Sequence, residues 1–416
     1  MYVLVQRGDQ ERVIEFKATD TINYGKGSTQ QSVELRNASG MPNYTKFKVT
    51  LRENTGTEKQ IKYNLVPLED DDKLSISADL VGKGKDNRDI FDDNKAQKMN
   101  AHDIRELREK GASSSEILET LISNSSSFNK KTEYSQEKYL KKKEKMYGDT
   151  VTLIKPTLSI LADYYFKKDP AKILNIRADT LSQILSYGNV HARGKYIVYE
   201  TGCSGLVVAA VLSRLSGEGL ALHVHPGSSP QRQAVNLMNF TSKELQPLRS
   251  LDVFYLVRQP ITSKAEDEIE SEPSTESSTD QPLIKKTKLD DCSDENSQTF
   301  PAKAPATVNR LENEKSLAIL QSTKFFGLLI MGKEHPLSIL QRLLPSLSPS
   351  APFVVYSQLA EPLGECYMWL KEKNLAVNIH LAENWCRNIQ VETERTHPEI
   401  NMSGTGGYFL TGTAIC

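Results

Sequence analysis

Several features that define other classes of protein are missing from this sequence. It contains no run of about 18 apolar residues, the length that a membrane-spanning helix needs, and no apolar N-terminal signal region. Its five cysteines, at positions 203, 292, 366, 386 and 416, show neither C-x-x-C nor metal-ligand spacing. We therefore expect a soluble, intracellular protein with reduced thiols, no metal site and no membrane contact.

Net charge is also nearly absent. The 416 residues include 52 basic and 53 acidic side chains, for a formal net charge of −1. Any contact with nucleic acid would have to come from local basic patches, because the overall field is weak. The apolar fraction of 38% is sufficient for a packed core, and the length predicts two or three domains.

The N-terminal third is expected to hold a β domain and a helical linker. Short alternating stretches at residues 2–5, 12–16, 47–51 and 61–65 predict strands, which we expect to form a small β-barrel over residues 1–80. Residues 81–150 predict a polar linker and then helices, since Asn100 and the pair Ser113 and Glu116 have N-cap spacing. A helical spacer is favoured over a DNA-reading helix-turn-helix, because no basic second helix follows.

Residues 151–416 alternate helical and strand patterns, which predicts an α/β fold with a doubly wound, mostly parallel sheet. A final antiparallel strand pair would match the Rossmann-like class I methyltransferase fold. Residues 264–312 interrupt this pattern. The stretch 264–296 has eleven acidic and four basic residues, so we expect a disordered acidic surface insertion. Its basic cluster at 285–288 indicates a nuclear import signal and a nuclear location.

A strand, a glycine turn and an apolar helix follow one another over residues 196–215. This order places ligands in α/β sheets, and the turn begins like the E-x-G-x-G-x-G pattern of S-adenosylmethionine sites. After Gly202, however, the second and third glycines are replaced by Ser204 and Leu206. The next strand ends at His225 without the acidic residue that would bind a ribose. We interpret this site as degenerate, with no cofactor bound and no catalytic residues in this chain.

Other chemistries are weaker candidates. His223 and His225 share one side of a strand, but the sequence places no third metal ligand near them, so no metal is expected. Glu334 is the only acid close after the strand that ends at Met331, and it comes late for a catalytic role. Cys203 is interpreted as a packed turn thiol rather than a nucleophile.

A basic segment spans residues 129–145, with seven lysines against three glutamates and with Tyr134 and Tyr139 among them. Such a segment can neutralise RNA phosphates and offer ring faces to unpaired bases, although a solvated helix face is the simpler interpretation. On a helix, four of its lysines would share one face. The candidate RNA-binding lysines are Lys138, Lys141, Lys142, Lys143 and Lys145.

Taken in order, several motifs resemble one known family, the non-catalytic, tRNA-binding subunits of eukaryotic tRNA (adenine(58)-N(1))-methyltransferases. The motifs are DNRDI at 86–90, YSQEKYLKKK at 134–143, ETGCSGL at 200–206, PFVVY at 352–356, WCRNIQV at 385–391, RTHP at 395–398 and MSGTGGY at 402–408. The β domain and the acidic insertion match this family only in type.

The resemblance implies a paralogue of the catalytic subunit that has lost cofactor binding. It would support that S-adenosylmethionine-dependent subunit in forming 1-methyladenosine, usually as a heterotetramer, and supply a tRNA-binding surface. Arg387 and Arg395 then become further candidates for contact with tRNA or for shaping the subunit interface, with a structural ion pair as the alternative. The competing hypothesis is an active S-adenosylmethionine-dependent RNA methyltransferase with an atypical glycine turn.

Overall fold

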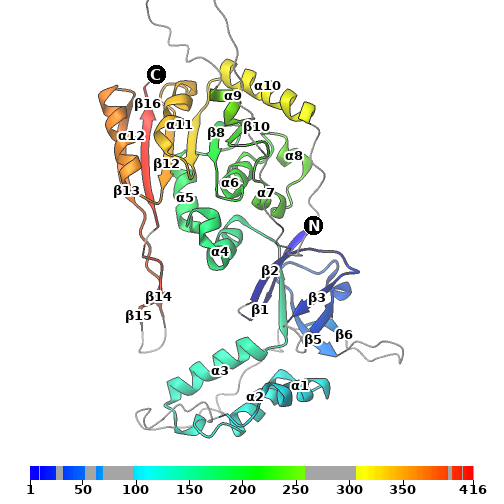
Figure 1. Cartoon of the computed structure of the whole chain (residues 1–416). Coiled ribbons are helices and arrows are strands. Elements are labelled where there is room, and N and C mark those ends of the chain that lie inside the picture. Colours follow the sequence, from blue (N-terminus) through cyan, green and yellow to red (C-terminus); the bar gives the residue numbers. More distant parts are fainter. Residues whose placement is uncertain are drawn as a thin grey trace, which may run out of the picture.

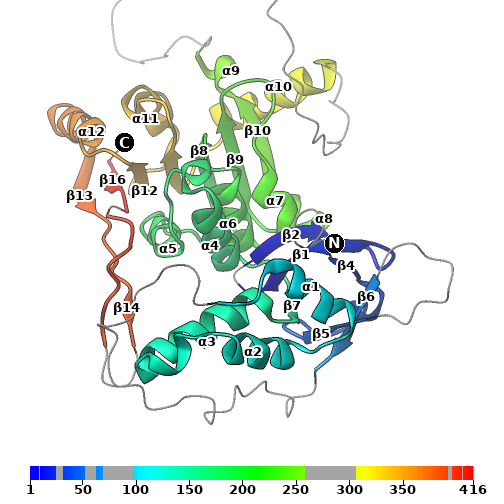
Figure 2. The ribbon, with the colours of Figure 1, turned by 60° about the horizontal axis from the view of Figure 1, so that its bottom comes forward.

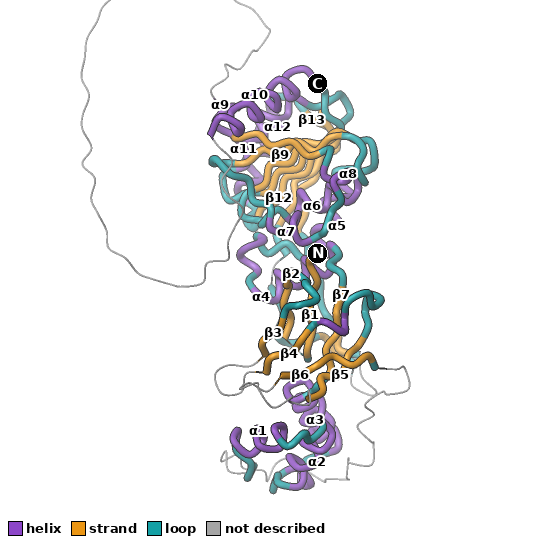
Figure 3. The backbone as a smooth tube through the Cα atoms, turned by 90° about the vertical axis from the view of Figure 1, so that its right-hand side faces the viewer, coloured by secondary structure: helices purple, strands orange, loops and turns teal. Residues whose placement is uncertain are grey.

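The computed structural model describes residues 1–8, 10–24, 31–51, 62–68, 97–257, 306–391, 396–404 and 406–415. The linker motif at 86–90, Arg395 and the stretch 264–296 with its basic cluster lie outside these residues. The described chain forms two seven-stranded sheets with a group of helices beside the first. Figure 3 shows the three parts one above another, with the second sheet at one end and the helices at the other.

The first sheet has the strand order β2-β1-β7-β5-β6-β4-β3. It curls so far that Arg12 of β2 donates a hydrogen bond of 2.8 Å to the carbonyl of Asn23 in β3, at the opposite edge. The expected small barrel is thus seen as a curled sheet around a core that includes Phe47 and Leu65. Its strands are β1 (Tyr2–Arg7), β2 (Gln10–Glu15), β3 (Thr21–Tyr24), β4 (Gln31–Glu34), β5 (Lys46–Leu51), β6 (Lys62–Pro67) and β7 (Thr150–Ile154).

Strand β7 was not expected in this sheet. From the sequence, the second domain was expected to begin at residue 151, but β7 pairs antiparallel with both β1 and β5. The first sheet is therefore completed by a strand that follows the helical segment. Local alternation cannot show this, because a strand's partners depend on pairings distant in the sequence.

The helical segment contains α1 (Ala101–Glu109), α2 (Ser114–Ser123) and α3 (Glu133–Tyr147). Both predicted N-caps are confirmed. The side chain of Asn100 accepts from the N–H groups of His102 and Asp103 at 2.7 and 3.0 Å, and Ser113 and Glu116 form a reciprocal capping box. Each cap satisfies N–H groups that lack a partner inside the helix.

The second sheet has the order β10-β9-β8-β11-β12-β16-β13. The first five strands are parallel, and β16 runs antiparallel to its neighbours β12 and β13. This confirms the predicted α/β fold with a Rossmann-like sheet and an antiparallel edge. The strands are β8 (Lys195–Glu200), β9 (Leu220–His225), β10 (Leu248–Asp252), β11 (Gly327–Met331), β12 (Pro352–Ser357), β13 (Ala376–Glu383) and β16 (Tyr408–Ala414).

Helices cover both faces of this sheet, and each face has its own hydrophobic cluster. Helices on one face are α4 (Leu158–Lys168), α5 (Ala178–Tyr187), α6 (Leu206–Leu215) and α7 (Gln233–Leu237), followed by the short α8 (Ser242–Leu245). Those on the other are α9 (Val253–Val257), α10 (Ala306–Ser322), α11 (Pro336–Leu343) and α12 (Glu361–Glu372). Short 3-10 turns are η2 (Arg36–Ala38), η4 (Phe128–Lys130), η5 (Pro170–Ile173) and η6 (Leu344–Ser346).

Between β13 and β16 the chain leaves the sheet as a long two-stranded arm. The arm consists of described residues 385–391 and 396–404 and contains the short strands β14 (Ile389–Gln390) and β15 (His397–Pro398). In both Figure 1 and Figure 2 it extends away from the second sheet toward α3. This projection was not predicted from the sequence.

The two sheets are joined by specific contacts. Leu4 of β1 and Ile154 of β7 pack against Tyr164 of α4 in a small buried cluster. Lys167 of α4 forms an ion pair of 3.3 Å with Glu11 of β2. Among the described residues, no helix combines the length and the apolar character needed to cross a membrane.

Candidate functional site

The glycine turn between β8 and α6 lies where a ligand would be expected, at the carboxyl end of a central strand. Gly202, Ser204 and Gly205 have positive φ angles of +75°, +58° and +79°. Two of their backbone N–H groups already have an acceptor inside the chain, because Oε1 of Gln231 accepts from Gly202 and from Ser204, each at 3.1 Å. A carbonyl oxygen of the protein therefore occupies the position in which these donors could bind a ligand.

The other side of the turn is covered by Lys333, from the loop after β11. A Cβ atom built on Gly202 would lie 2.6 Å from Cε of Lys333, so the lysine stem packs directly on the glycine. Glu334, the late acid considered from the sequence, is also engaged. Its carboxylate accepts from the hydroxyl groups of Tyr199 at 3.0 Å and Thr201 at 3.4 Å. Each carboxylate oxygen of Glu334 therefore accepts a hydrogen bond.

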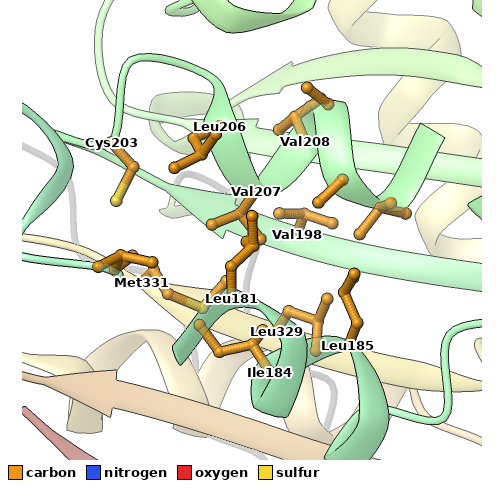
Figure 4. Packing of buried hydrophobic residues seen from close by; sticks show 14 of the residues in the cluster. Leu181, Ile184, Leu185, Val198, Cys203, Leu206, Val207, Val208, Leu329 and Met331 are labelled. Carbon is orange, nitrogen blue, oxygen red and sulfur yellow. The ribbon is translucent and has the colours of Figure 1, made fainter. Parts of the chain in front are cut away.

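Beneath the turn the structure is apolar. Cys203 and Leu206 are fully buried and face the same packed layer as Met331 at the end of β11, as Figure 4 shows. Burial raises the pKa of the Cys203 thiol well above its ordinary value, so a nucleophilic thiolate is disfavoured. The hydroxyl of Ser204 donates to the carbonyl of Lys172 at 3.1 Å, which ties the turn to the segment after α4.

A buried polar layer lies between the strand ends and α6 and α7. Glu200, at the end of β8, is 1% exposed, and its Oε2 accepts from the N–H of Val208 at 2.9 Å. Burial raises the Glu200 pKa to about 7. His223 and His225 of β9 are also buried, and burial lowers the pKa of both. Arg232, just before α7, donates to the hydroxyl of Ser250 in β10 at 2.5 Å.

These groups do not form a metal centre. No set of three or more His, Cys, Asp or Glu side chains suitable for a metal ion occurs in the described part of the chain. Nor do they fit the ribose of S-adenosylmethionine, which needs an acceptor carboxylate after β9. That strand ends at His225, while Glu218, before the strand, is paired with Arg193 at 2.6 Å.

The basic segment forms helix α3, which spans the predicted lysine positions. The side chains of Lys138, Lys141, Lys142 and Lys145 are all exposed, while Gln136 and Leu140 on the same helix are buried. We call these four exposed lysines the lysine face. It presents cationic side chains at i, i+3, i+4 and i+7, as expected for one side of a helix.

Lys143 does not belong to this face. Its Nζ lies 5.4 Å from the ring centre of Tyr139 and 5.5 Å from that of Tyr147, and burial lowers its pKa. Tyr139 also packs edge-on against Phe128 and accepts a hydrogen bond from Gln97. The structure thus corrects the expectation that Tyr139 offers a free ring face to a base, because cations and a second ring already contact it.

The arm carries apolar side chains that were not singled out from the sequence. Trp385 is 62% exposed, Ile389 58%, Val391 79% and Ile400 89%. Arg387 is exposed among them, while Arg395 lies outside the described residues. A sequence signal exists, since Trp385, Ile389 and Val391 fall within seven residues that follow β13 and precede the final strand β16. Exposed apolar residues gathered on one element indicate an interaction surface.

Comparison with known proteins supplies the family. A model of the Gcd10p family matches residues 1–286. The protein described as tRNA (adenine(58)-N(1))-methyltransferase non-catalytic subunit TRM6 from Mus musculus is 32% identical over 451 aligned residues, covering 100% of this chain and 87% of that protein. A relative from Dictyostelium discoideum with the same description is 33% identical, covering 99% of this chain and 77% of its own length.

Among solved structures, the tRNA (m1A58) methyltransferase TrmI from Aquifex aeolicus aligns over 100% of this chain and 97% of its own, with 10% identity and a TM-score of 0.45. The family model spans well over half of the chain, and the two relatives are similar along nearly all of it. This chain belongs to the Gcd10p family.

Proposed function

We propose that this chain is the non-catalytic subunit of a tRNA (adenine(58)-N(1))-methyltransferase. It binds tRNA and supports a separate catalytic subunit, which uses S-adenosylmethionine to form 1-methyladenosine. The names of the relatives support this assignment over the alternative of an active methyltransferase with an atypical turn.

One observation carries the non-catalytic assignment. The donors of the glycine turn are bound to Gln231, and the face of Gly202 is covered by Lys333. A cofactor would have to displace both side chains and would then find no carboxylate after His225 for its ribose. We therefore assign no cofactor to this chain and derive no chemical step from it.

The lysine face supports the tRNA part of the proposal. Four exposed lysines on one side of a helix can neutralise several phosphates in a protein whose overall charge is near zero. Lys143, Arg387 and Arg395 were also proposed to contact RNA. Of these, Arg387 remains a candidate because it is exposed on the arm, whereas Lys143 serves the packing of α3.

The arm supports the partner part of the proposal. An extended arm with exposed Trp385, Ile389, Val391 and Ile400 resembles half of a protein interface, with large apolar side chains that need a complementary surface. We assign this surface to the catalytic subunit. The relatives' description as a non-catalytic subunit requires such a partner. Two copies of each chain, in a heterotetramer, and a nuclear location complete the proposal.

The test is co-expression with the catalytic paralogue of the same organism. The two chains should co-purify with a mass of two copies of each, and the complex should methylate a tRNA transcript in which A58 is present but not one in which it is replaced. Full methylation by the paralogue alone would refute the support role. Calorimetric titration of the isolated chain with S-adenosylmethionine should give no signal, and a micromolar Kd would favour the active-enzyme alternative.

Two matched variants test the arm. Trp385→Ala should weaken association with the catalytic subunit, whereas Met368→Ala, a similarly exposed apolar residue on α12, should not. If both variants associated with the catalytic subunit equally well, the arm would not be part of the interface. A reporter fused to residues 282–288 tests the nuclear location, which fails if the reporter stays outside the nucleus.

A further inference from the structure

The two strands of the arm leave the second sheet at a compact polar network. Asn384, the last residue before the arm, is 3% exposed. Its side-chain amide donates to the hydroxyl of Thr180 at 2.6 Å and to the carboxylate of Asp179 at 3.4 Å. Its side-chain oxygen accepts from Gln183 at 3.2 Å. All three partners belong to helix α5, about 200 positions earlier in the chain.

The returning strand is held at the same place. The backbone N–H of Asn384 donates to the carbonyl of Gly407 at 2.8 Å, which ties the outgoing strand to the returning one. A Cβ atom on Gly406 would overlap the backbone carbonyl oxygen of Asn384 and lie 2.7 Å from a guanidinium nitrogen of Arg177. Only glycine fits at this point. The hydroxyl of Tyr356 contacts the carbonyls of Leu174 and Gly406 at 2.9 and 3.3 Å.

An ion pair fixes the helix side of the network. Arg177 binds both oxygens of Asp179 at 2.9 Å, in the bidentate geometry that gives such pairs a defined orientation. This hydrogen-bonded pairing lowers the pKa of Asp179. The Arg177 side chain is 14% exposed, so the pair is shielded from solvent on that side. Asp179 is thereby held in place to accept from Asn384.

We infer that Arg177, Asp179 and Asn384 form a clamp that sets the direction of the arm and so presents its apolar side chains to the catalytic subunit. These are positioning residues, because they lie at the root of the arm and Asn384 is buried. The inference rests on the proposed role of the arm in assembly and adds what holds the arm in place. A long projection on two strands would otherwise be free to swing about its root, and association would then include the cost of ordering it.

The experiment uses the full chain and the co-expressed catalytic subunit. Asn384→Ala removes the three side-chain hydrogen bonds, and Gly406→Ala forces the two strands apart. Both should leave the far-ultraviolet spectrum unchanged, speed amide exchange over residues 385–391 and 396–404, and weaken association about tenfold, as loss of an interface hot spot would. Asn236→Ala, on the exposed side of α7, is the control and should change neither the amide exchange of the arm nor the association.

The outcomes separate the clamp from the arm interface. If Trp385→Ala weakens association while Asn384→Ala and Gly406→Ala bind and exchange like the wild type, the clamp is wrong and the interface stands. If Trp385→Ala has no effect, the arm interface itself fails. Should Asn384→Ala not fold, Asp179→Asn replaces it, since it keeps the shape but abolishes the ion pair. Unchanged exchange in the arm of that variant would equally overturn the clamp.

Discussion

Asn239, after α7 in the second domain, pairs its side-chain amide with both backbone groups of Tyr2 in β1. Its Oδ1 accepts from the N–H of Tyr2 at 2.6 Å, and its Nδ2 donates to the carbonyl of Tyr2 at 2.8 Å. A side chain thus imitates one rung of a β-ladder between two domains. Asn239 can hold this position because it adopts a left-handed backbone conformation, with φ of +55°.

The first prediction concerns this contact. Asn239→Gly keeps the backbone conformation but removes both hydrogen bonds. We expect a loss of about 1–3 kcal/mol in the free energy of unfolding, the sum of two partly buried hydrogen bonds. Urea denaturation measures it, with Asn236→Ala as a control for α7. A loss no greater than that of the control would mean that this contact does not stabilise the protein, and that the Tyr164 cluster and the Lys167–Glu11 ion pair hold the domains together.

The second prediction concerns the pH dependence of stability. Burial raises the pKa of Glu200 from 4.5 to about 7, so the stability contributed by its protonated form is lost as pH rises through this window. His223 acts in the opposite sense, since its lowered pKa costs stability when pH falls below 6.5. Glu200→Gln isolates the first effect. As pH rises from 5 to 8, the free energy of unfolding of the variant should increase relative to that of the wild type, as measured by urea denaturation at several pH values. An identical slope in both proteins would contradict burial as the cause.

The third prediction concerns the lysine face. Replacing Lys138, Lys141, Lys142 and Lys145 by alanine should weaken tRNA binding by the complex and leave assembly intact. Each lost phosphate contact should reduce the slope of log affinity against log salt by roughly 0.7 to 0.9. The measurement is a salt series of tRNA titrations. Lys371→Ala with Lys373→Ala, exposed lysines at the end of α12, serves as the control. An unchanged slope would leave α3 as a solvated helix and direct attention to Arg387.

Lys143 gives a separate, contrasting prediction. Because it packs between the rings of Tyr139 and Tyr147, Lys143→Ala should lower the melting temperature more than Lys142→Ala does. Lys142→Ala should instead reduce tRNA affinity and leave the melting temperature nearly unchanged. Thermal unfolding and tRNA titration of the two variants check this. If Lys143→Ala lowered tRNA affinity and Lys142→Ala lowered the melting temperature, Lys143 would lie on the RNA surface.

The last prediction addresses the filled turn. In Gln231→Ala the N–H groups of Gly202 and Ser204 lose their acceptor, and each hydrogen bond is worth about 1 kcal/mol. Exchange of these two amides should therefore accelerate about fivefold, as measured by nuclear magnetic resonance. Titration with S-adenosylmethionine should still give no signal, since the ribose acceptor after His225 is missing. Gln233→Ala, an exposed change on α7, is the control. Tight cofactor binding by Gln231→Ala would show that the site is only blocked and not degenerate.

Much of the fold could be predicted from the sequence because it depends on local patterns. The strand, turn and helix at 196–215 follow one another directly in the sequence. The caps at Asn100 and Ser113 and the helical spacing of the lysine face involve residues within about two helical turns of each other. Strand β10 was not predicted, since Leu248–Asp252 contains few apolar residues and lies at an edge of the sheet.

Tertiary structure alone decided how these parts serve the proposed function. The sequence places Lys142 and Lys143 side by side, but the fold turns one to solvent and packs the other between two tyrosines. It also brings Gln231 and Lys333 onto opposite sides of one turn, and Asn384 onto Thr180, across 204 positions of the chain. Side-chain periodicity reports only which face a residue occupies on its own element. Which group meets it there depends on the packing of the elements.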